Sequence, residues 1–170
     1  GDSTSNAEIF ARHMGTNAIV RITEPLVGGQ PNGNNSSASI SANGRYVAFT
    51  STATNLTGDI DTSIQNVLIK DRDTDNDGVF DEAGAVSYRS ASKGYNPFIL
   101  GTPIVNMNNS SSAPYISDDG SKVAFSSLAT NYYCSVVSGC LDTNGVEDVF
   151  VFDAATGHAD RVSLSANNAQ

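Results

Sequence analysis

An internal repeat constrains this chain more than any other feature of its sequence. Residues 40–56 read ISANGRYVAFTSTATNL, and residues 116–132, which begin 76 positions later, read ISDDGSKVAFSSLATNY. The two segments align without a gap, and self-similarity at a fixed period indicates a repeat architecture. The chain is therefore expected to consist of repeated structural units.

Each unit begins with a predicted β-hairpin. The turns are centred on Asn43-Gly44 and on Asp119-Gly120. Asn-Gly and Asp-Gly are strong hairpin signals, because both turn residues must accept a positive φ angle. The apolar strands that follow these turns are expected at residues 46–49 and 122–125.

A third and a fourth strand are expected in each unit, and this strand pair recurs three times. Residues 1–30 align with residues 141–170 without a gap, and the alignment matches Phe10 to Phe150. The chain thus ends on the kind of element with which it begins. The predicted third strands are residues 7–12, 65–71 and 147–153, and the predicted fourth strands are residues 18–23, 85–89 and 159–164.

Repeated four-stranded units of this length are typical of β-propeller blades. The predicted organisation is a half blade at residues 1–30, a full blade at 31–95 and a full blade at 96–170. We expect an all-β fold of about two and a half antiparallel blades, too few to close a ring within the chain, since closed propellers use about four to eight. An ordinary β-sandwich with two similar hairpins does not explain the ungapped overlap of the two ends.

Several motifs carry a family resemblance. They are I-S-x-x-G-x-x-V-A-F, the S-x-A-T-N that follows it, the run DTNGVEDVFV at residues 142–151, and Arg161-Val162-Ser163 at the end of the unit. This combination resembles the TolB-like, WD40-like propeller repeats of secreted bacterial proteins, and it covers nearly the whole chain. The resemblance implies a propeller and a secreted protein. Because the family includes periplasmic binding proteins, peptidase accessory domains and surface proteins, it implies no particular activity.

The net charge argues against one class of partner. Nine basic and eighteen acidic residues give a formal charge of −9 at pH 7, which repels nucleic acid and anionic lipid. No apolar run has the length needed to span a bilayer. Residues 1–6 lack the basic and apolar regions of a signal peptide, so we expect mature or excised material.

Cys134 and Cys140 are the two cysteines of the chain, and both lie in a polar loop at residues 131–141. A disulfide between them is our preferred interpretation, and in the chain-entropy model it contributes on the order of 2 kcal/mol. The alternative is a pair of free surface thiols. A disulfide implies an oxidising compartment, so we expect an extracellular or cell-surface location, with the periplasm as the alternative.

One loop carries a metal-binding pattern. Between the third and fourth strands of the middle unit, residues 71–84 replace a turn that is short in the other units, and they contain D-x-D-x-D-G-x-x-D. Carboxylates at alternate positions converge on one ion when Gly78 makes a sharp turn, and hard oxygen ligands in this number favour Ca²⁺. The predicted ligands are Asp73, Asp75, Asp77, the carbonyl of Val79, and Asp81 directly or through water.

The alternative for this loop is a solvated acidic turn. Six carboxylates between residues 71 and 82 repel one another in a compact loop, and a Debye length of about 8 Å screens them little. The loop differs from an EF-hand because Gly84 stands where the bidentate glutamate belongs. It is more similar to the strand-flanked calcium loops of integrin-type propellers and to dockerin-like or thrombospondin-like aspartate repeats. The expected role of the ion is structural.

Two further groups of residues are not expected to be functional sites. A second acidic cluster, at Asp142, Asn144, Gly145 and Asp148, is expected to cap turns rather than to hold an ion. The two histidines, His13 and His158, are expected beside hairpin turns, and the sequence contains no G-x-S-x-G, H-E-x-x-H or Walker motif. We therefore expect no enzymatic activity.

The expected function is that of a secreted, calcium-stabilised propeller-repeat module with a structural or protein-interaction role. Open blade edges favour either a homo-oligomer or filament formed head to tail, or completion by the remainder of a longer propeller. The alternative is the non-catalytic propeller portion of a larger secreted hydrolase or lyase. A G-x-S-x-G region in further sequence would favour that alternative.

Overall fold

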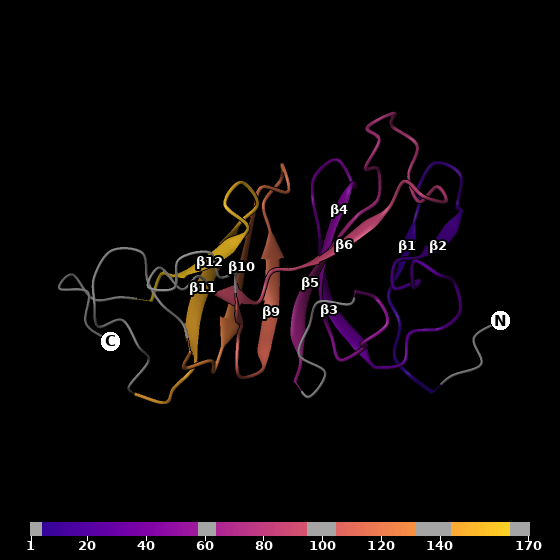
Figure 1. The fold of residues 1–170 in the computed structure, drawn as a ribbon. Helices are drawn as coiled ribbons and strands as arrows, with labels where there is room; N and C mark the ends of the chain where they lie inside the picture. The colour runs from indigo at the N-terminus through magenta and orange to yellow at the C-terminus, as the bar shows by residue number, and fades with distance from the viewer. Residues whose placement is uncertain (1–4, 58–63, 95–104, 132–143, 164–170) are drawn as a thin grey trace.

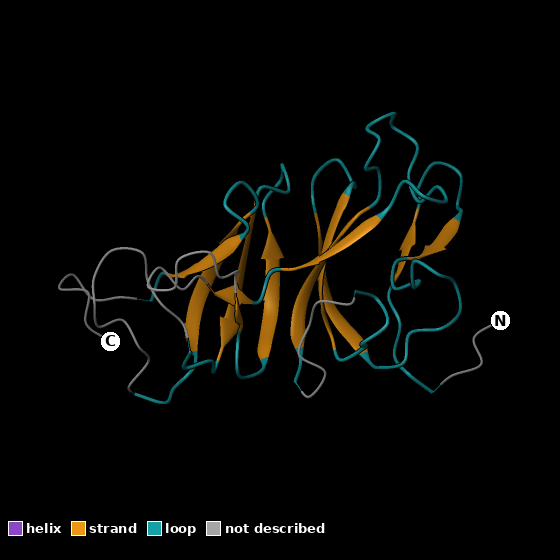
Figure 2. Ribbon diagram, viewed as in Figure 1, coloured by secondary structure: helices purple, strands orange, loops and turns teal. Residues whose placement is uncertain are grey.

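The fold is built from antiparallel β-sheets (Figures 1 and 2). The computed structural model describes residues 5–57, 64–94, 105–131 and 144–163, and within these ranges there is no helix, hence none suited to crossing a membrane. Two sheets have four strands and two sheets have two strands, and none is closed into a barrel. This confirms the prediction of an all-β fold of propeller-type blades. The strands are β1 (Phe10–Arg12), β2 (Ile19–Arg21), β3 (Asn35–Ile40), β4 (Tyr46–Ser51), β5 (Asn66–Asp71), β6 (Ser87–Ser90), β7 (Lys93–Gly94), β8 (Val105–Asn106), β9 (Ser111–Ile116), β10 (Lys122–Ser127), β11 (Asp148–Asp153) and β12 (His158–Arg161).

Three of the sheets stand in a row, as Figure 1 shows. We call β1–β2 the half blade, β3–β6 the middle blade and β9–β12 the terminal blade; in both full blades the strand order in the sheet follows the chain. The small β7–β8 sheet was not expected from the sequence. It lies between the two full blades along the chain and contacts β12.

Two apolar cores hold the three blades face to face. Since successive side chains of a strand point to opposite faces of its sheet, β4 contributes to both: Val47 and Phe49 face the half blade, whereas Ala48 faces the terminal blade. Each fully buried Phe stabilises the fold by about 2–3 kcal/mol. The first core also contains Ile22, Ala53, Leu56 and Leu68, and the second contains Val67, Ile69, Val123, Phe125, Phe150 and Phe152.

The third and fourth strands close in the same way in all three units. In the half blade the Ile9 N–H donates to the Thr23 hydroxyl at 3.3 Å, and the Ile22 N–H donates to the Ile9 carbonyl at 2.8 Å. The half blade therefore closes with the same hydrogen bonds as the last two strands of each full blade. The equivalent bonds run from Val67 to Ser92 and from Ala91 to Val67 in the middle blade, and from Val149 to Ser163 and from Val162 to Val149 in the terminal blade.

An ion pair, buried in the terminal blade and partly exposed in the half blade, accompanies this closure in two of the units. In the terminal blade Arg161 Nη1 lies 2.9 Å from Asp148 Oδ2, and both side chains are buried. In the half blade Arg21 Nη1 lies 3.4 Å from Glu8 Oε2, at the equivalent positions. A buried pair of this kind satisfies two charges that would each be costly alone.

The middle blade carries neutral residues where the other units carry the ion pair. Asn66 aligns with the acidic residue, and Ser90 aligns with the arginine. The Asn66 side-chain carbonyl accepts a hydrogen bond from the Ser92 hydroxyl at 3.2 Å, and the Ser90 and Ser92 hydroxyls lie 3.2 Å apart. Both charges have thus been replaced together, and hydroxyl and amide groups fill the positions.

Gly120 of the terminal blade lies directly against Tyr46 of the middle blade. Its φ angle is +74°, and a Cβ atom built on it would lie 2.1 Å from the ring of Tyr46. Gly44 holds the same place in the middle blade, with a φ angle of +77°, but its nearest neighbour is a Phe80 ring atom at 3.5 Å. Both positions therefore favour glycine because of their positive φ angles, and position 120 also has no room for a Cβ atom.

We expect Gly120→Ala to be clearly more destabilising than Gly44→Ala. A left-handed alanine costs about 1–2 kcal/mol at either position, and overlap with Tyr46 adds about 1–3 kcal/mol at position 120 only. Urea unfolding of both variants measures the two free energies of unfolding. Equal losses would contradict the close contact with Tyr46.

A side-chain cap holds each hairpin turn. Asp119 Oδ1 accepts hydrogen bonds from the Ser117 hydroxyl at 2.6 Å and from the Ser121 N–H at 2.9 Å. These bonds lower the pKa of Asp119 to about 2. In the middle blade Asn43 accepts the same two bonds with its amide oxygen, from Ser41 at 2.8 Å and from the Arg45 N–H at 3.1 Å.

We expect the Asp119 cap to make folding sensitive to acid. Because the folded pKa lies below the ordinary value of 3.8, the cap contributes its stability above that pH and loses it as the pH falls toward 2. Asp119→Asn copies Asn43 and should flatten the loss of stability in this window, whereas the exposed neighbour variant Asp118→Asn should keep the wild-type profile. Urea midpoints measured from pH 5 to pH 2 test this, and identical slopes for all three proteins would refute it.

Candidate metal centre

The loop between β5 and β6 is anchored to the hairpin turn of the middle blade. Arg45 binds Asp71 with two hydrogen bonds, from Nε at 2.8 Å and from Nη2 at 3.0 Å, and its Nη1 donates to Asn76 Oδ1 at 2.6 Å. The bonds to Asp71 raise the pKa of Arg45 above its ordinary value, against the opposing effect of burial. One carboxylate of the acidic loop is therefore already neutralised by a cation.

Asp81 is neutralised in the same way. Its Oδ2 accepts hydrogen bonds from Arg72 Nε at 2.9 Å and Nη2 at 2.6 Å, and its Oδ1 lies 2.9 Å from Nζ of the buried Lys70. Burial alone would raise the pKa of Asp81, but the hydrogen bonds and charges of Arg72 and Lys70 outweigh it and lower the pKa. The structure thus places Asp81 with two cations at the base of the loop, apart from the other predicted ligands.

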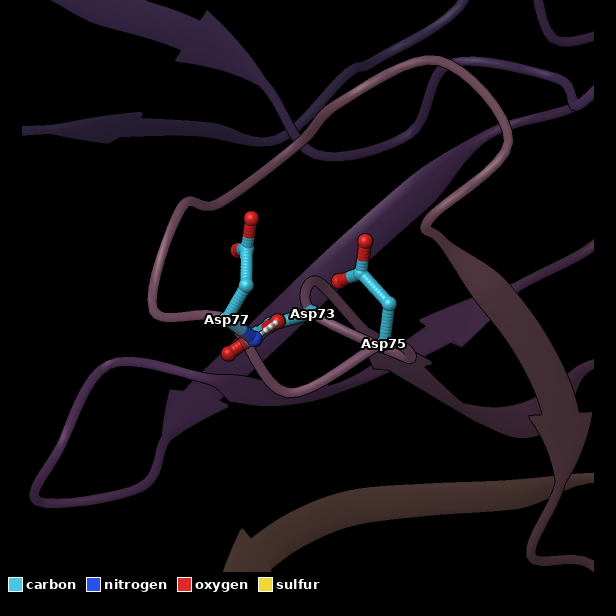
Figure 3. A group of neighbouring side chains, drawn as sticks. All are labelled: Asp73, Asp75 and Asp77. Atoms are coloured by element: carbon cyan, nitrogen blue, oxygen red, sulfur yellow. Dashed lines mark hydrogen bonds between the residues drawn. The ribbon is translucent and has the colours of Figure 1, made fainter.

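Three of the predicted ligands do come together. Asp73, Asp75 and Asp77 each offer one carboxylate oxygen, and these oxygens lie within 4.8 Å of one another (Figure 3). Calcium binds oxygen at about 2.3–2.6 Å, so ligands on opposite sides of one ion are separated by about 5 Å. The spacing and the hard oxygen donors therefore fit a calcium ion. We call these residues the aspartate triad.

The backbone of the loop folds around the buried Asp73. Its Oδ1 accepts the Asp77 N–H at 3.1 Å and its Oδ2 accepts the Gly78 N–H at 3.2 Å, while Asp77 Oδ1 accepts the Val79 N–H at 2.8 Å. Gly78 has a φ angle of +89°, which is the sharp turn expected at this glycine. Val79, the predicted carbonyl ligand, follows directly and has an exposed side chain.

The aspartate triad concentrates negative charge at the tip of the loop. The pKa of the neighbouring Glu82 is raised, first by the charge of Asp77, then by desolvation and by the charges of Asp75 and Asp73. The carboxylates at the base of the loop are paired with basic side chains, whereas within the described residues those of the triad form no ion pair with a basic side chain. The tip is therefore the part of the loop that attracts a cation.

The cations at the base of the loop were missed by the sequence reasoning, although a signal for them exists. Lys70 and Arg72 are two residues apart at the end of β5, so their side chains leave the strand on the same side. Two basic side chains on one side of a strand that precedes an acidic loop predict a partner carboxylate. Asp81 is that partner.

The other predicted site residues have separate places. Cys134, Cys140 and Asp142 lie outside the described residues. In the second acidic cluster the Asn144 side chain accepts the Val146 N–H at 2.9 Å, and Asp148 forms the ion pair of the terminal blade. These contacts are of the turn-capping and structural kind expected for the cluster.

Comparison with known proteins does not identify a family for this chain. No protein-family model matches the chain, and a search of curated proteins finds no match. The resemblance to TolB-like repeats stays a prediction from the sequence motifs, and the fold rests on the sheets themselves.

Proposed function

We propose that this chain is a secreted, calcium-stabilised propeller-repeat module whose role is structural and non-catalytic. In this role it associates with further copies of itself through blade faces, and the ion orders the loop between β5 and β6. One observation supports the association above all others. It is an apolar face that is covered in two of the units and exposed in the third.

This face belongs to the last two strands of the terminal blade. Val162 is 52% exposed, whereas Ile22, which aligns with it in the half blade, is 1% exposed. Val149 is 43% exposed, whereas the aligned Val67 of the middle blade is fully buried. An exposed apolar patch whose equivalents are buried against a neighbouring blade supports a role in association. We call Val149 and Val162 the outward face.

The half blade offers a matching surface at the other end of the row. Phe10 and Ile19, in its two strands, are 55% and 65% exposed. The residues that align with them, Phe150 and Ala159, are buried in the core between the middle and terminal blades. Contact between the outward face of one copy and the half blade of the next would repeat that internal contact, and a head-to-tail contact of this kind builds a ring or a filament.

The aspartate triad supports the calcium part of the proposal. Asp73, Asp75 and Asp77 would hold the ion, which supplies positive charge between three carboxylates that otherwise repel one another. Because the base of the loop is already fixed by Arg45, Lys70 and Arg72, the ion is expected to order the tip.

Val162→Glu is expected to weaken self-association strongly, because a charge on the outward face has to be desolvated on contact. Val27→Glu is the matched control, since Val27 is exposed in a loop of the half blade. Light scattering should show a mass that rises with concentration for the wild type and for Val27→Glu, with association at least about tenfold weaker for Val162→Glu. A wild-type chain that stays monomeric would contradict the association and favour a portion of a larger protein.

Calcium is expected to raise the melting temperature relative to EDTA. At a calcium concentration of about 100 times Kd, binding stabilises the fold by about 2.7 kcal/mol, which corresponds to about 5–10 °C for a chain of this size. Asp75→Ala should lose most of this shift, and Asp118→Ala, which removes an exposed carboxylate outside the loop, should keep it. Equal melting temperatures in calcium and in EDTA would rule out the ion.

A further inference from the structure

A cavity of about 270 Å³ lies between the middle blade and the terminal blade. Its lining consists of Tyr46, Asp71, Ser87 and Arg89 of the middle blade and of Ala154 in the turn after β11. In the sheet, Asp71 lies directly opposite both Tyr46 and Ser87. Opposite residues point to the same face of a sheet, and Arg89 shares that face because it is two residues from Ser87. The strand register therefore brings these side chains together.

Arg89 has no acidic partner in the part of the chain that the structure describes. Its guanidinium carbon lies 5.2 Å from the centroid of the Phe152 ring, a cation–π contact that holds the side chain between the two blades. Among the described residues, no hydrogen bond or ion pair engages its N–H groups. A guanidinium has five N–H donors, so those of Arg89 are available to an acceptor in the cavity.

The packing of the blades does not require a charge at this position. Val20 aligns with Arg89 in the half blade, because Val20 lies opposite Ala11 as Arg89 lies opposite Ile69. Val20 packs against the core between the half blade and the middle blade. An apolar side chain thus serves the stacking of the equivalent unit, and the cation of Arg89 is a property of the middle blade.

Two hydroxyl groups add to the donors around the cavity. The side chains of Tyr46 and Ser87 have no hydrogen-bond partner within the described ranges. The ring of Tyr46 is held in place by the Arg45 guanidinium, 5.0 Å from its centroid, and by the turn at Gly120. A fixed ring presents its hydroxyl without a further loss of side-chain freedom on binding.

The charge balance of the cavity favours a single negative charge. Asp71 is the one acidic residue in the described lining. Its two carboxylate oxygens accept hydrogen bonds from Arg45 at 2.8 Å and 3.0 Å, and its Oδ1 also accepts the Asp73 N–H at 3.1 Å. The charge of Asp71 is therefore balanced by Arg45, whereas the charge of Arg89 is not balanced.

We propose that this cavity binds the carboxylate of a small organic acid. The planar fork of the Arg89 guanidinium matches the two oxygens of a carboxylate, and the hydroxyls of Tyr46 and Ser87 donate further hydrogen bonds to them. Ala154 and the Tyr46 ring offer apolar surface to a short carbon chain. A phosphate dianion fits less well, because Asp71 repels its second charge.

Titration of the isotope-labelled full chain with acetate, followed by nuclear magnetic resonance, tests this proposal. The amide signals of Ser87, Arg89 and Ala154 should shift and saturate, with the ionic strength held constant by chloride. Acetamide has nearly the same shape but no charge, so it should bind at least about tenfold more weakly. Phosphate, at a pH of about 8 where it is a dianion, should also bind more weakly than acetate.

Four variants sharpen the test. Arg89→Gln should weaken acetate binding by at least about tenfold, since hydrogen bonds to charged groups are the strong ones. Arg89→Lys keeps the charge but lacks the fork, so its affinity should lie between those of the wild type and Arg89→Gln. Tyr46→Phe should weaken binding by about two- to tenfold, the value of one hydrogen bond. Arg12→Gln is the matched control, because it removes an exposed cation of the half blade that bonds to Asn17, and it should leave acetate binding unchanged.

Three results would overturn the inference. They are the lack of saturable shifts in the wild-type chain, equal binding of acetate and acetamide, and equal acetate binding by the wild type and Arg89→Gln. Tighter binding of phosphate than of acetate would overturn the assignment to a carboxylate. If the melting curve shows that Arg89→Gln does not fold, Arg89→Val takes its place, since it copies Val20 of the half blade.

The site goes beyond the proposed function, because it requires neither calcium nor the outward face. A chain that binds acetate but neither associates nor responds to calcium keeps the site and loses the proposed function. A chain that associates and responds to calcium but does not bind acetate keeps the proposed function and loses the site.

Discussion

Each blade of this chain has two apolar faces, and neither can be buried without a neighbouring blade. The middle blade shows the constraint most clearly, because Phe49 and Leu68 face the half blade while Val67 and Ile69 face the terminal blade. A sheet that is apolar on both faces gains its stability from stacking, as repeat proteins generally do. Gly120, which has a positive φ angle, lets the hairpin turn of the terminal blade pack directly against Tyr46 of the middle blade.

The acidic loop has two parts, which differ in whether their carboxylates are paired with basic side chains. The carboxylates at its base, Asp71 and Asp81, are paired with Arg45, Lys70 and Arg72 and so fasten the loop to the middle blade. Those at its tip converge and remain available to a cation. The loop thereby combines a rigid attachment with a strongly negative end.

Local chemistry explains what the sequence could predict. The glycines of the predicted turns, Gly44 and Gly120, do have positive φ angles, but Asn43 and Asp119 do not, so each turn uses one such residue rather than the two that were expected. The β7–β8 pair gave no signal because each of its strands has two residues, too few for an alternating pattern. The alternate spacing of Asp73, Asp75 and Asp77 predicts that their carboxylates converge. The position of Asp81 depends instead on Lys70 and Arg72, whose side chains leave β5 on one side and bind its carboxylate.

Tertiary geometry decides what no local signal reveals. Ser37 and Ala113 occupy equivalent places at the irregular positions of β3 and β9, with φ angles of 53° and 48°. Neither residue favours this conformation by itself. That both units adopt it indicates that the packing of the inner strands imposes it.

The middle blade has Asn66 and Ser90 where the other units have an ion pair, and this limits which strands can be exchanged between units. Exchanging a third or fourth strand between units would pair Asn66 with an arginine or Ser90 with an aspartate, and either chimera would contain a lone buried charge. Such a charge costs about 3–5 kcal/mol, against a total stability of about 5–15 kcal/mol for a typical domain. An exchange of one strand within a pair is therefore expected to destabilise the unit, whereas an exchange of the whole pair keeps its closing contacts together.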